Sequence, residues 1–339
     1  MRSINFEIKP KSVVVTFALL AVFLIIYQMK ELLLFLFASF IIASALMPII
    51  DGMSKKMKRP VAVALVYLVI FLLVLTIFIP FFAIFTDQSQ EFIKQFPRYF
   101  GIIENQVLQW KSTSQILGLI PDHNQILSAF AKHGESIVSQ SINLTINIFG
   151  AIIAFFTLAT IVLFILLDKD SLKKGFLSFF PADKRDTVDE IAVTISKRVG
   201  GYVRGQLAVM VAVGIVTGFC LVLLNIPFAF LLGMVAGLLE IVPIIGPLFS
   251  VIPAALLALA IHPWLAVAVI VLYFIIQRVE NFVAPFVYGK FLDMPPLVII
   301  IALLVAASTL GLTGVVLAPA IAAAVYVLVQ ELYLKKINP

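Results

Sequence analysis

Long apolar runs separated by short charged stretches form the pattern of this chain. Five runs reach the roughly 20 residues that a helix needs to cross a bilayer, at residues 13–29, 32–50, 61–85, 144–167 and 207–224. From Pro227 onwards the chain stays apolar, but prolines and glycines interrupt it repeatedly. The pattern predicts an all-α, polytopic membrane protein with about eight transmembrane segments.

Composition supports this prediction and removes several classes of function. Hydrophobic residues make up 62% of the chain and charged residues only 12%, about half the charged share of a soluble domain. No phosphate-binding loop, nucleophile elbow or HExxH motif occurs, so we expect no enzyme and no cofactor. The single cysteine, Cys220, rules out an internal disulfide, and the three histidines lack ligand spacing. We expect no resident metal.

The charged loops predict the orientation in the membrane. Residues 51–60 and 168–206 are rich in Lys and Arg, whereas residues 87–141 carry a mixture of both signs. The positive-inside rule therefore places the first two loops in the cytoplasm. It places both chain ends there too, the C-terminus because of Lys335 and Lys336. The net charge of +6 reflects this topology, not nucleic-acid binding, and the first apolar run is expected to be a retained helix of an inner-membrane protein.

These loops divide the chain into five parts. We expect a three-span block at 1–86, extracytoplasmic amphipathic helices at 87–142, a fourth span at 143–167, a cytoplasmic linker helix at 168–206 and a transport domain at 207–339. Pro97 is expected to interrupt the outer helix, whose apolar stripe either covers its own spans or contacts a neighbouring subunit. Gly200, Gly201 and Gly205 are expected to permit a bend where the chain re-enters the membrane.

Two equally long segments, 227–261 and 296–330, each contain helix breakers near the middle. Such segments are typical of broken or re-entrant helical hairpins, which line a transport site near the membrane midplane. Similar flanks at residues 251–260 and 316–325 suggest a faint repeat of opposite orientation. The expected breaks, with one further proline after the intervening span, are Pro243, Gly246, Pro247, Pro253, Pro285, Gly311, Gly314 and Pro319.

Polar residues inside these apolar runs are the candidate binding residues. They are Glu240, Arg278, Glu280, Asn281, Thr309 and Thr313. Glu240 either forms a structural ion pair with Arg278 or exchanges a proton against substrate or Na⁺, and a transient Na⁺ near Glu240 is compatible with both interpretations. Arg278 and Glu280 are two residues apart on one helix, so only one of them can point at Glu240.

Four stretches carry a resemblance to a known family, in order and in spacing. They are GYVRGQLAVMVAVGIVTG, LLGMVAGLLEIVPIIGPLFSVIPA, QRVENFVAPFVYGKFLDMPPL and LGLTGVVLAPAIA. Together they resemble the autoinducer-2 exporter (AI-2E) family, and the pattern E-x-x-P-x-x-G-P at 240–247 is the most specific part. Ile244, Ala284 and residues 306–308 depart from the family's usual aromatic, Gln and Gly.

The resemblance implies a secondary transporter that works as a homo-oligomer, with a pentamer as the expected form, and with an elevator-like moving domain. It implies export of a small polar solute such as autoinducer-2, exchange of Na⁺ or Li⁺ for H⁺, or both. The expected partners are therefore the lipid bilayer, the solute, a monovalent cation and a proton. A passive channel and a scaffold that acts through the linker at 168–206 remain as alternatives.

Overall fold

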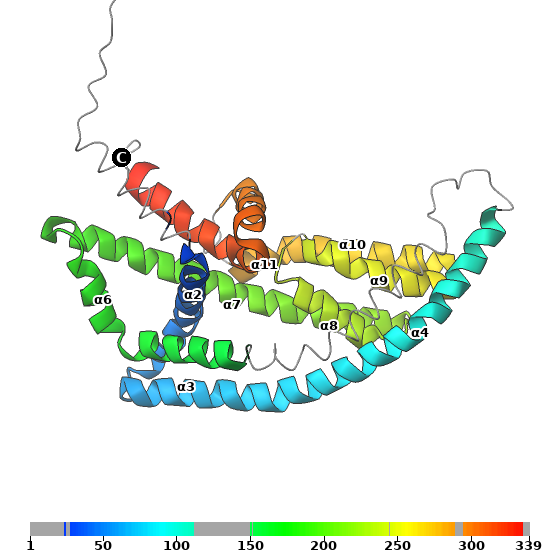
Figure 1. Ribbon diagram of the computed structural model, residues 1–339, viewed down its shortest axis with the longest axis horizontal. Coiled ribbons are helices and arrows are strands. Elements are labelled where there is room, and N and C mark those ends of the chain that lie inside the picture. Colours follow the sequence, from blue (N-terminus) through cyan, green and yellow to red (C-terminus); the bar gives the residue numbers. More distant parts are fainter. Residues whose placement is uncertain are drawn as a thin grey trace, which may run out of the picture.

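The computed structural model describes residue 24, residues 28–111, residue 150 and residues 152–243, 245–288 and 294–334. All the regular elements in these ranges are helices (Figure 1), which confirms the predicted all-α class. Five of the described helices are long and apolar enough to cross a membrane, and a bent pair makes a sixth. The expected span at 13–29, the outer segment beyond Lys111 and the two C-terminal lysines lie outside the described residues, apart from isolated positions.

The first half of the described chain consists of α2 (Lys30–Met53), α3 (Arg59–Leu73), the π-helical turn η1 (Val74–Phe78), α4 (Ile79–Lys111), a helix at Ile152–Leu167 and α6 (Lys169–Ser178). The second half consists of η2 (Ala182–Lys184), α7 (Arg185–Leu223), α8 (Ala229–Leu239), α9 (Ile245–Ile261), α10 (Pro263–Tyr288), α11 (Pro296–Val329) and η4 (Gln330–Leu334). Figure 1 shows α7 running through the middle, with α8, α9 and α10 gathered beside its second half.

Helices α3 and α4 form one long curved rod, joined through η1 (Figure 1). Contrary to our expectation, Pro97 does not interrupt this rod and lies inside α4. The rings of Phe92 and Tyr99 lie edge-on to the ring of Phe228, with centroids 5.6 and 6.5 Å away. Of the two expectations for the outer stripe, this contact supports the one in which α4 covers the chain's own helices.

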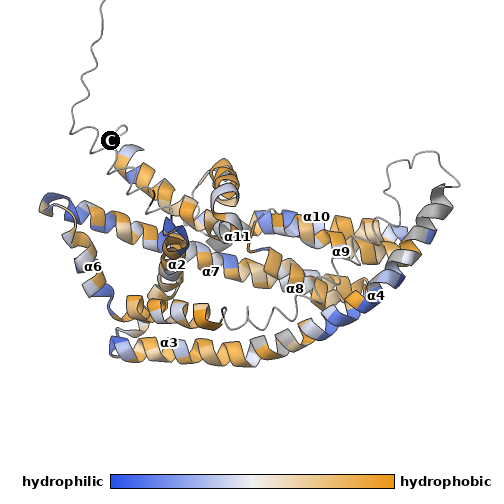
Figure 2. Cartoon of the chain, in the orientation of Figure 1, coloured by the Kyte–Doolittle hydropathy of each residue, from blue (hydrophilic) through white to orange (hydrophobic). Residues whose placement is uncertain are grey.

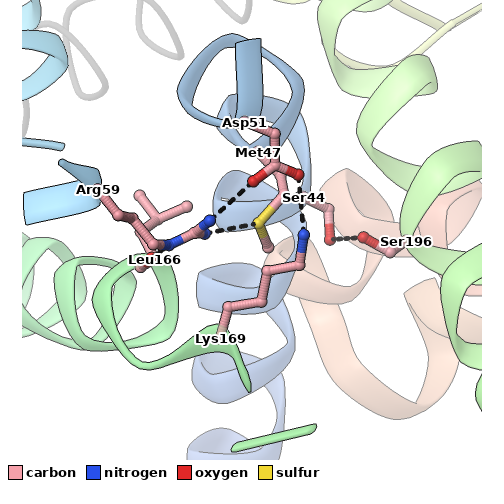
Figure 3. A network of polar contacts seen from close by, with 7 residues as sticks. All are labelled: Ser44, Met47, Asp51, Arg59, Leu166, Lys169 and Ser196. Atoms are coloured by element: carbon pink, nitrogen blue, oxygen red, sulfur yellow. Dashed lines mark hydrogen bonds and ion pairs between the residues drawn. The ribbon is translucent and has the colours of Figure 1, made fainter. Parts of the chain in front are cut away.

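Helix α7 is one continuous helix from the charged linker into the apolar span, so the expected bend at Gly200, Gly201 and Gly205 was wrong. Gly200 serves close packing instead. A Cβ atom at Gly200 would overlap the backbone of Ser44 in α2, so the two helices touch at this point. The hydroxyl of Ser196 donates to that of Ser44 at 3.0 Å, one turn away (Figure 3). Small residues at a helix crossing allow such contact in a membrane protein.

A second glycine contact joins α7 to α8. Gly214 and Gly218 on α7 face Gly233 and Gly237 on α8, with the same four-residue spacing on both helices. A Cβ at Gly233 would lie 2.6 Å from the Cα of Gly218 and 2.7 Å from the carbonyl oxygen of Gly214. In lipid the hydrophobic effect contributes little to helix association. Close backbone packing of this kind stabilises the helix pair instead.

Both Pro/Gly-rich segments are interrupted. The first is broken between α8 and α9, and the second has a kink at Gly311, whose φ of 64° and ψ of −151° only glycine adopts readily. Pro253 and Pro319, which we expected at breaks, lie inside α9 and α11. Pro285 and Gly314 also lie within helices.

A polar clasp joins the two basic loops. Asp51, in the last turn of α2, accepts hydrogen bonds from Arg59 and Lys169, each at 2.8 Å (Figure 3). The Nε of Arg59 also donates to the carbonyl of Leu166 at 2.6 Å, at the end of the 152–167 helix. The clasp therefore ties the α2–α3 turn to the end of the fourth expected span, and it places both loops on one side of the protein.

We expect Asp51→Asn to destabilise the protein by about 1 kcal/mol, because both ion pairs weaken while part of their charge stays in water. The thermal unfolding midpoint in detergent, followed by circular dichroism, should fall, and the difference should shrink at high salt. Asp183→Asn is the matched control, because Asp183 is exposed and no ion pair is seen for it among the described residues. An unchanged midpoint for Asp51→Asn would show that the clasp does not contribute to stability.

Candidate functional site

The break between α8 and α9 carries the central residue of the site. Glu240 follows the last residue of α8 and has no exposed surface. Its backbone N–H still donates to the carbonyl of Ala236 at 3.1 Å, so the helical hydrogen bonding of α8 continues up to Glu240. Pro243 has no N–H to continue the helix. The chain turns here, and α9 starts again at Ile245.

Gly246 is required at this turn. A Cβ atom on Gly246 would overlap the carbonyl group of Leu239, which is backbone and therefore has little freedom to move away. The N–H of Gly246 donates to the carbonyl of Val242 at 2.9 Å and closes the turn. Glycine thus lets α9 begin directly beside the end of α8, and this proximity keeps Glu240 inside the protein.

Glu280 on α10 is the charged neighbour of Glu240. The two carboxyl groups line the same small cavity and are close enough to interact with one another. Gln277 donates to Glu280 at 3.0 Å. Neither carboxylate oxygen of Glu240 accepts a hydrogen bond from any donor that the structure describes. A buried acid beside a half-buried one is not a simple structural ion pair, because no ion pair to either acid is seen within the described part of the chain.

The two acids line a small cavity between four helices. Its polar lining consists of Thr217 from α7, Glu240 from α8, Ser250 from α9, and Tyr273, Gln277 and Glu280 from α10. The space admits about one water molecule or one small ion. The hydroxyl oxygens of Thr217 and Tyr273 are buried and, like the carboxylate of Glu240, have no hydrogen-bond partner among the described residues.

Buried oxygens without a protein partner need another bound group in the cavity as their partner. Buried polar atoms in native proteins are almost always hydrogen-bonded, so several unsatisfied ones around one cavity indicate a bound water, ion or proton. Carboxylate and hydroxyl oxygens are hard ligands, which suit alkali cations better than transition metals. No group of three or more His, Cys, Asp or Glu side chains that could hold a metal occurs in the described part of the chain. The arrangement can therefore take up a proton or a single small cation.

Gln206 ties this site to α7. Its side-chain amide is buried and donates to the backbone carbonyl of Glu240 at 2.5 Å. The carbonyl freed by the end of α8 is thus satisfied from a neighbouring helix. Gln206, Val213 and Thr217 lie on one face of α7 at helical spacing, and this face is turned toward the break.

The other predicted binding residues lie outside the cavity. The guanidinium of Arg278 lies over the ring of Phe274, 4.6 Å from its centroid, on an exposed side of α10. Asn281 is exposed as well. Thr309 and Thr313 are exposed near the kink of α11, and each donates to a carbonyl of its own helix, Val305 or Leu310. Glu280, and not Arg278, is the residue that points at Glu240.

Sequence reasoning missed Thr217, Ser250, Tyr273, Gln277 and Gln206. Each is an uncharged polar residue inside an apolar run or at its end, and such residues usually bond to their own helix. A signal was nevertheless present. Tyr273, Gln277 and Glu280 recur at helical spacing and so predict a polar stripe on one face of α10.

Comparisons with known proteins also point to a transporter. Residues 16–334 match the model of the AI-2E family transporters. A Bacillus subtilis relative, YueF, is 26% identical over 85% of this chain and 79% of its own length. A Thermotoga maritima relative is 25% identical over 87% of this chain and 92% of its own length.

Another Bacillus subtilis relative, YrrI, is 30% identical, but the match covers only 48% of this chain and 46% of that protein. All three relatives carry the name "Putative transport protein". The matched family model covers nearly the whole length of the sequence, including both broken segments and the acid pair. The chain therefore belongs to the AI-2E transporter family.

Proposed function

We propose that the protein is a secondary transporter in which Glu240 and Glu280 bind a proton or a monovalent cation in turn. In this proposal the protein exports a small polar solute of the autoinducer-2 type, exchanges Na⁺ or Li⁺ for H⁺, or couples the two. The observation that carries the proposal is the buried Glu240 at the helix break, beside Glu280 and with carboxylate oxygens that no described donor satisfies.

The acid pair needs a positive charge from outside the protein. Two carboxylates this close repel each other, and burial removes the water that would otherwise screen them. A bound proton or a bound Na⁺ relieves the repulsion equally well, so the two ions compete for one place. Competition of this kind at a single site is the physical basis of antiport, because each ion can be released only where the other is bound.

The break between α8 and α9 would also let the two helices move relative to one another and open the cavity. Elements joined by broken backbone are the usual hinges in transporters. We propose an elevator-like cycle in a homo-oligomer of the bacterial inner membrane, with the clasped basic loops and both chain ends on the cytoplasmic side. This orientation is supported by the basic loops, which Asp51 brings together.

Purified protein in liposomes that contain a pH-sensitive dye gives the direct test. If Na⁺ is added outside, Na⁺ entry coupled to H⁺ exit should raise the internal pH, with Li⁺ acting similarly and K⁺ much less. A well-folded protein that gives no change with any cation would exclude cation–proton antiport. Uptake of labelled autoinducer-2 into everted vesicles, with and without a proton gradient, would then test whether the protein exports a small polar solute.

A further inference from the structure

Helix α6 packs weakly on the rest of the protein. It has ten residues, none of them buried. A helix this short is unstable in water unless other surfaces support it. Two ion pairs hold it in place, from Lys169 to Asp51 and from Lys173 to Asp189, both at 2.8 Å. These contacts fix the helix but leave Leu172, Phe176 and the neighbouring Phe179 at least half exposed.

The apolar residues of α6 form a stripe. Leu172 and Phe176 lie in α6, and Phe179 follows its last residue with a helical backbone. The three recur at spacings of four and three residues, so they share one face. Their side chains are 50%, 50% and 85% exposed. Lys174 lies on the opposite face. Large exposed aromatic residues gathered on one side of a helix mark a contact surface rather than a solvated one.

The position of α6 indicates what covers the stripe. The helix follows directly on the membrane-spanning helix 152–167 and is bent from it by 83°. A helix that turns by nearly a right angle at the end of a span lies in the plane of the membrane surface, at the level of the lipid headgroups. Figure 1 shows α6 crossing between the ends of this span and of α7.

We propose that α6 is an interfacial helix whose Leu172, Phe176 and Phe179 insert into the headgroup–acyl boundary of the adjacent leaflet. Acidic and basic side chains nearly balance between Asp168 and Glu190, with hydrophilic residues gathered at the start of α7 (Figure 2). The charge pattern therefore fits phospholipid in general and needs no anionic headgroup. This helix anchors the polar segment between the fourth expected span and α7, residues 168–184, to the bilayer.

Tryptophan fluorescence of the full-length protein in phosphatidylcholine liposomes tests this. In a background of Trp110→Phe and Trp264→Phe, Phe179→Trp reports on the stripe and Lys174→Trp on the opposite face. Lipids brominated near the headgroup end of the acyl chain should remove about half or more of the emission at position 179 and little at position 174. Aqueous iodide should show the opposite order.

Three results would overturn the proposal. Equal bromolipid quenching at both positions, or stronger iodide quenching at position 179, would mean that the stripe is not inserted. Protection of position 179 from both quenchers would mean that protein covers it, as a second copy of the chain would. If Phe179→Trp does not fold, Leu172→Trp replaces it. The assay is independent of transport, so failure of the proposed function does not affect it.

Discussion

Glu240→Gln should abolish cation-dependent proton movement in liposomes while leaving the fold intact. Glutamine keeps the shape of the side chain but can neither bind a proton nor attract a cation by charge. We expect the rate of internal pH change to fall by about 100-fold or more, since a coupling ion without its ligand is not carried at all. The thermal unfolding midpoint should stay equal or rise, because removing a buried charge that lacks a donor costs the folded state nothing.

The matched control is Glu190→Gln, which removes the same charge from an exposed position on α7 far from the cavity. It should retain full flux. The measurement is the initial rate of dye response after addition of Na⁺, normalised to the amount of reconstituted protein. Normal flux in Glu240→Gln would show that the acid pair is structural, and loss of flux together with loss of helicity would show that Glu240 is needed for folding.

Gly233→Ala should destabilise the protein by about 1–3 kcal/mol, the usual range when one carbon is forced into a closely packed place. The added methyl would meet backbone atoms of Gly214 and Gly218 at 2.6–2.8 Å, and backbone cannot rotate out of the way as a side chain can. Helices α7 and α8 would have to separate. Because Gln206 and Thr217 approach Glu240 from α7, the cavity should widen as well.

The measurement is the thermal unfolding midpoint in detergent, together with the transport rate in liposomes. Gly52→Ala is the matched control, because a methyl group there meets nothing within 4 Å and alanine favours the helix. Its midpoint should be unchanged or slightly higher. An unchanged midpoint for Gly233→Ala would mean that the two helices are not as closely packed in the membrane as they are in the structure.

The sequence was sufficient to predict the helical class, and it singled out the two acids of the candidate site among six candidate binding residues. Helix class follows from run length and hydropathy, which the bilayer thickness imposes on any spanning segment. Glu240 and Glu280 stand out because a charge in an apolar run always needs a physical reason. Gly246 and Gly311 could be named as breakers for a similar reason, since glycine inside an apolar span weakens a helix.

The pairing within the site could not be predicted. Whether Arg278 or Glu280 faces Glu240 depends on the rotation of α10 about its axis, and this rotation is set by packing against α7 and α9. Glycine was ambiguous for a related reason. At Gly200 we expected its conformational freedom to produce a bend, whereas the structure uses its lack of a side chain to bring α2 against α7. The sequence alone does not distinguish a glycine that allows a bend from one that allows close packing.

The unbroken length of α7 has a mechanical consequence. The same helix holds Gln206 and Thr217 at the site and, at its other end, Asp189, which is bridged to Lys173 of α6. A continuous helix resists bending because bending stretches its backbone hydrogen bonds. A small tilt of α7 at the acid pair must therefore swing its charged end through a larger arc. If the proposed transport cycle tilts α7, a spectroscopic label near Asp189 would therefore report that movement from outside the membrane.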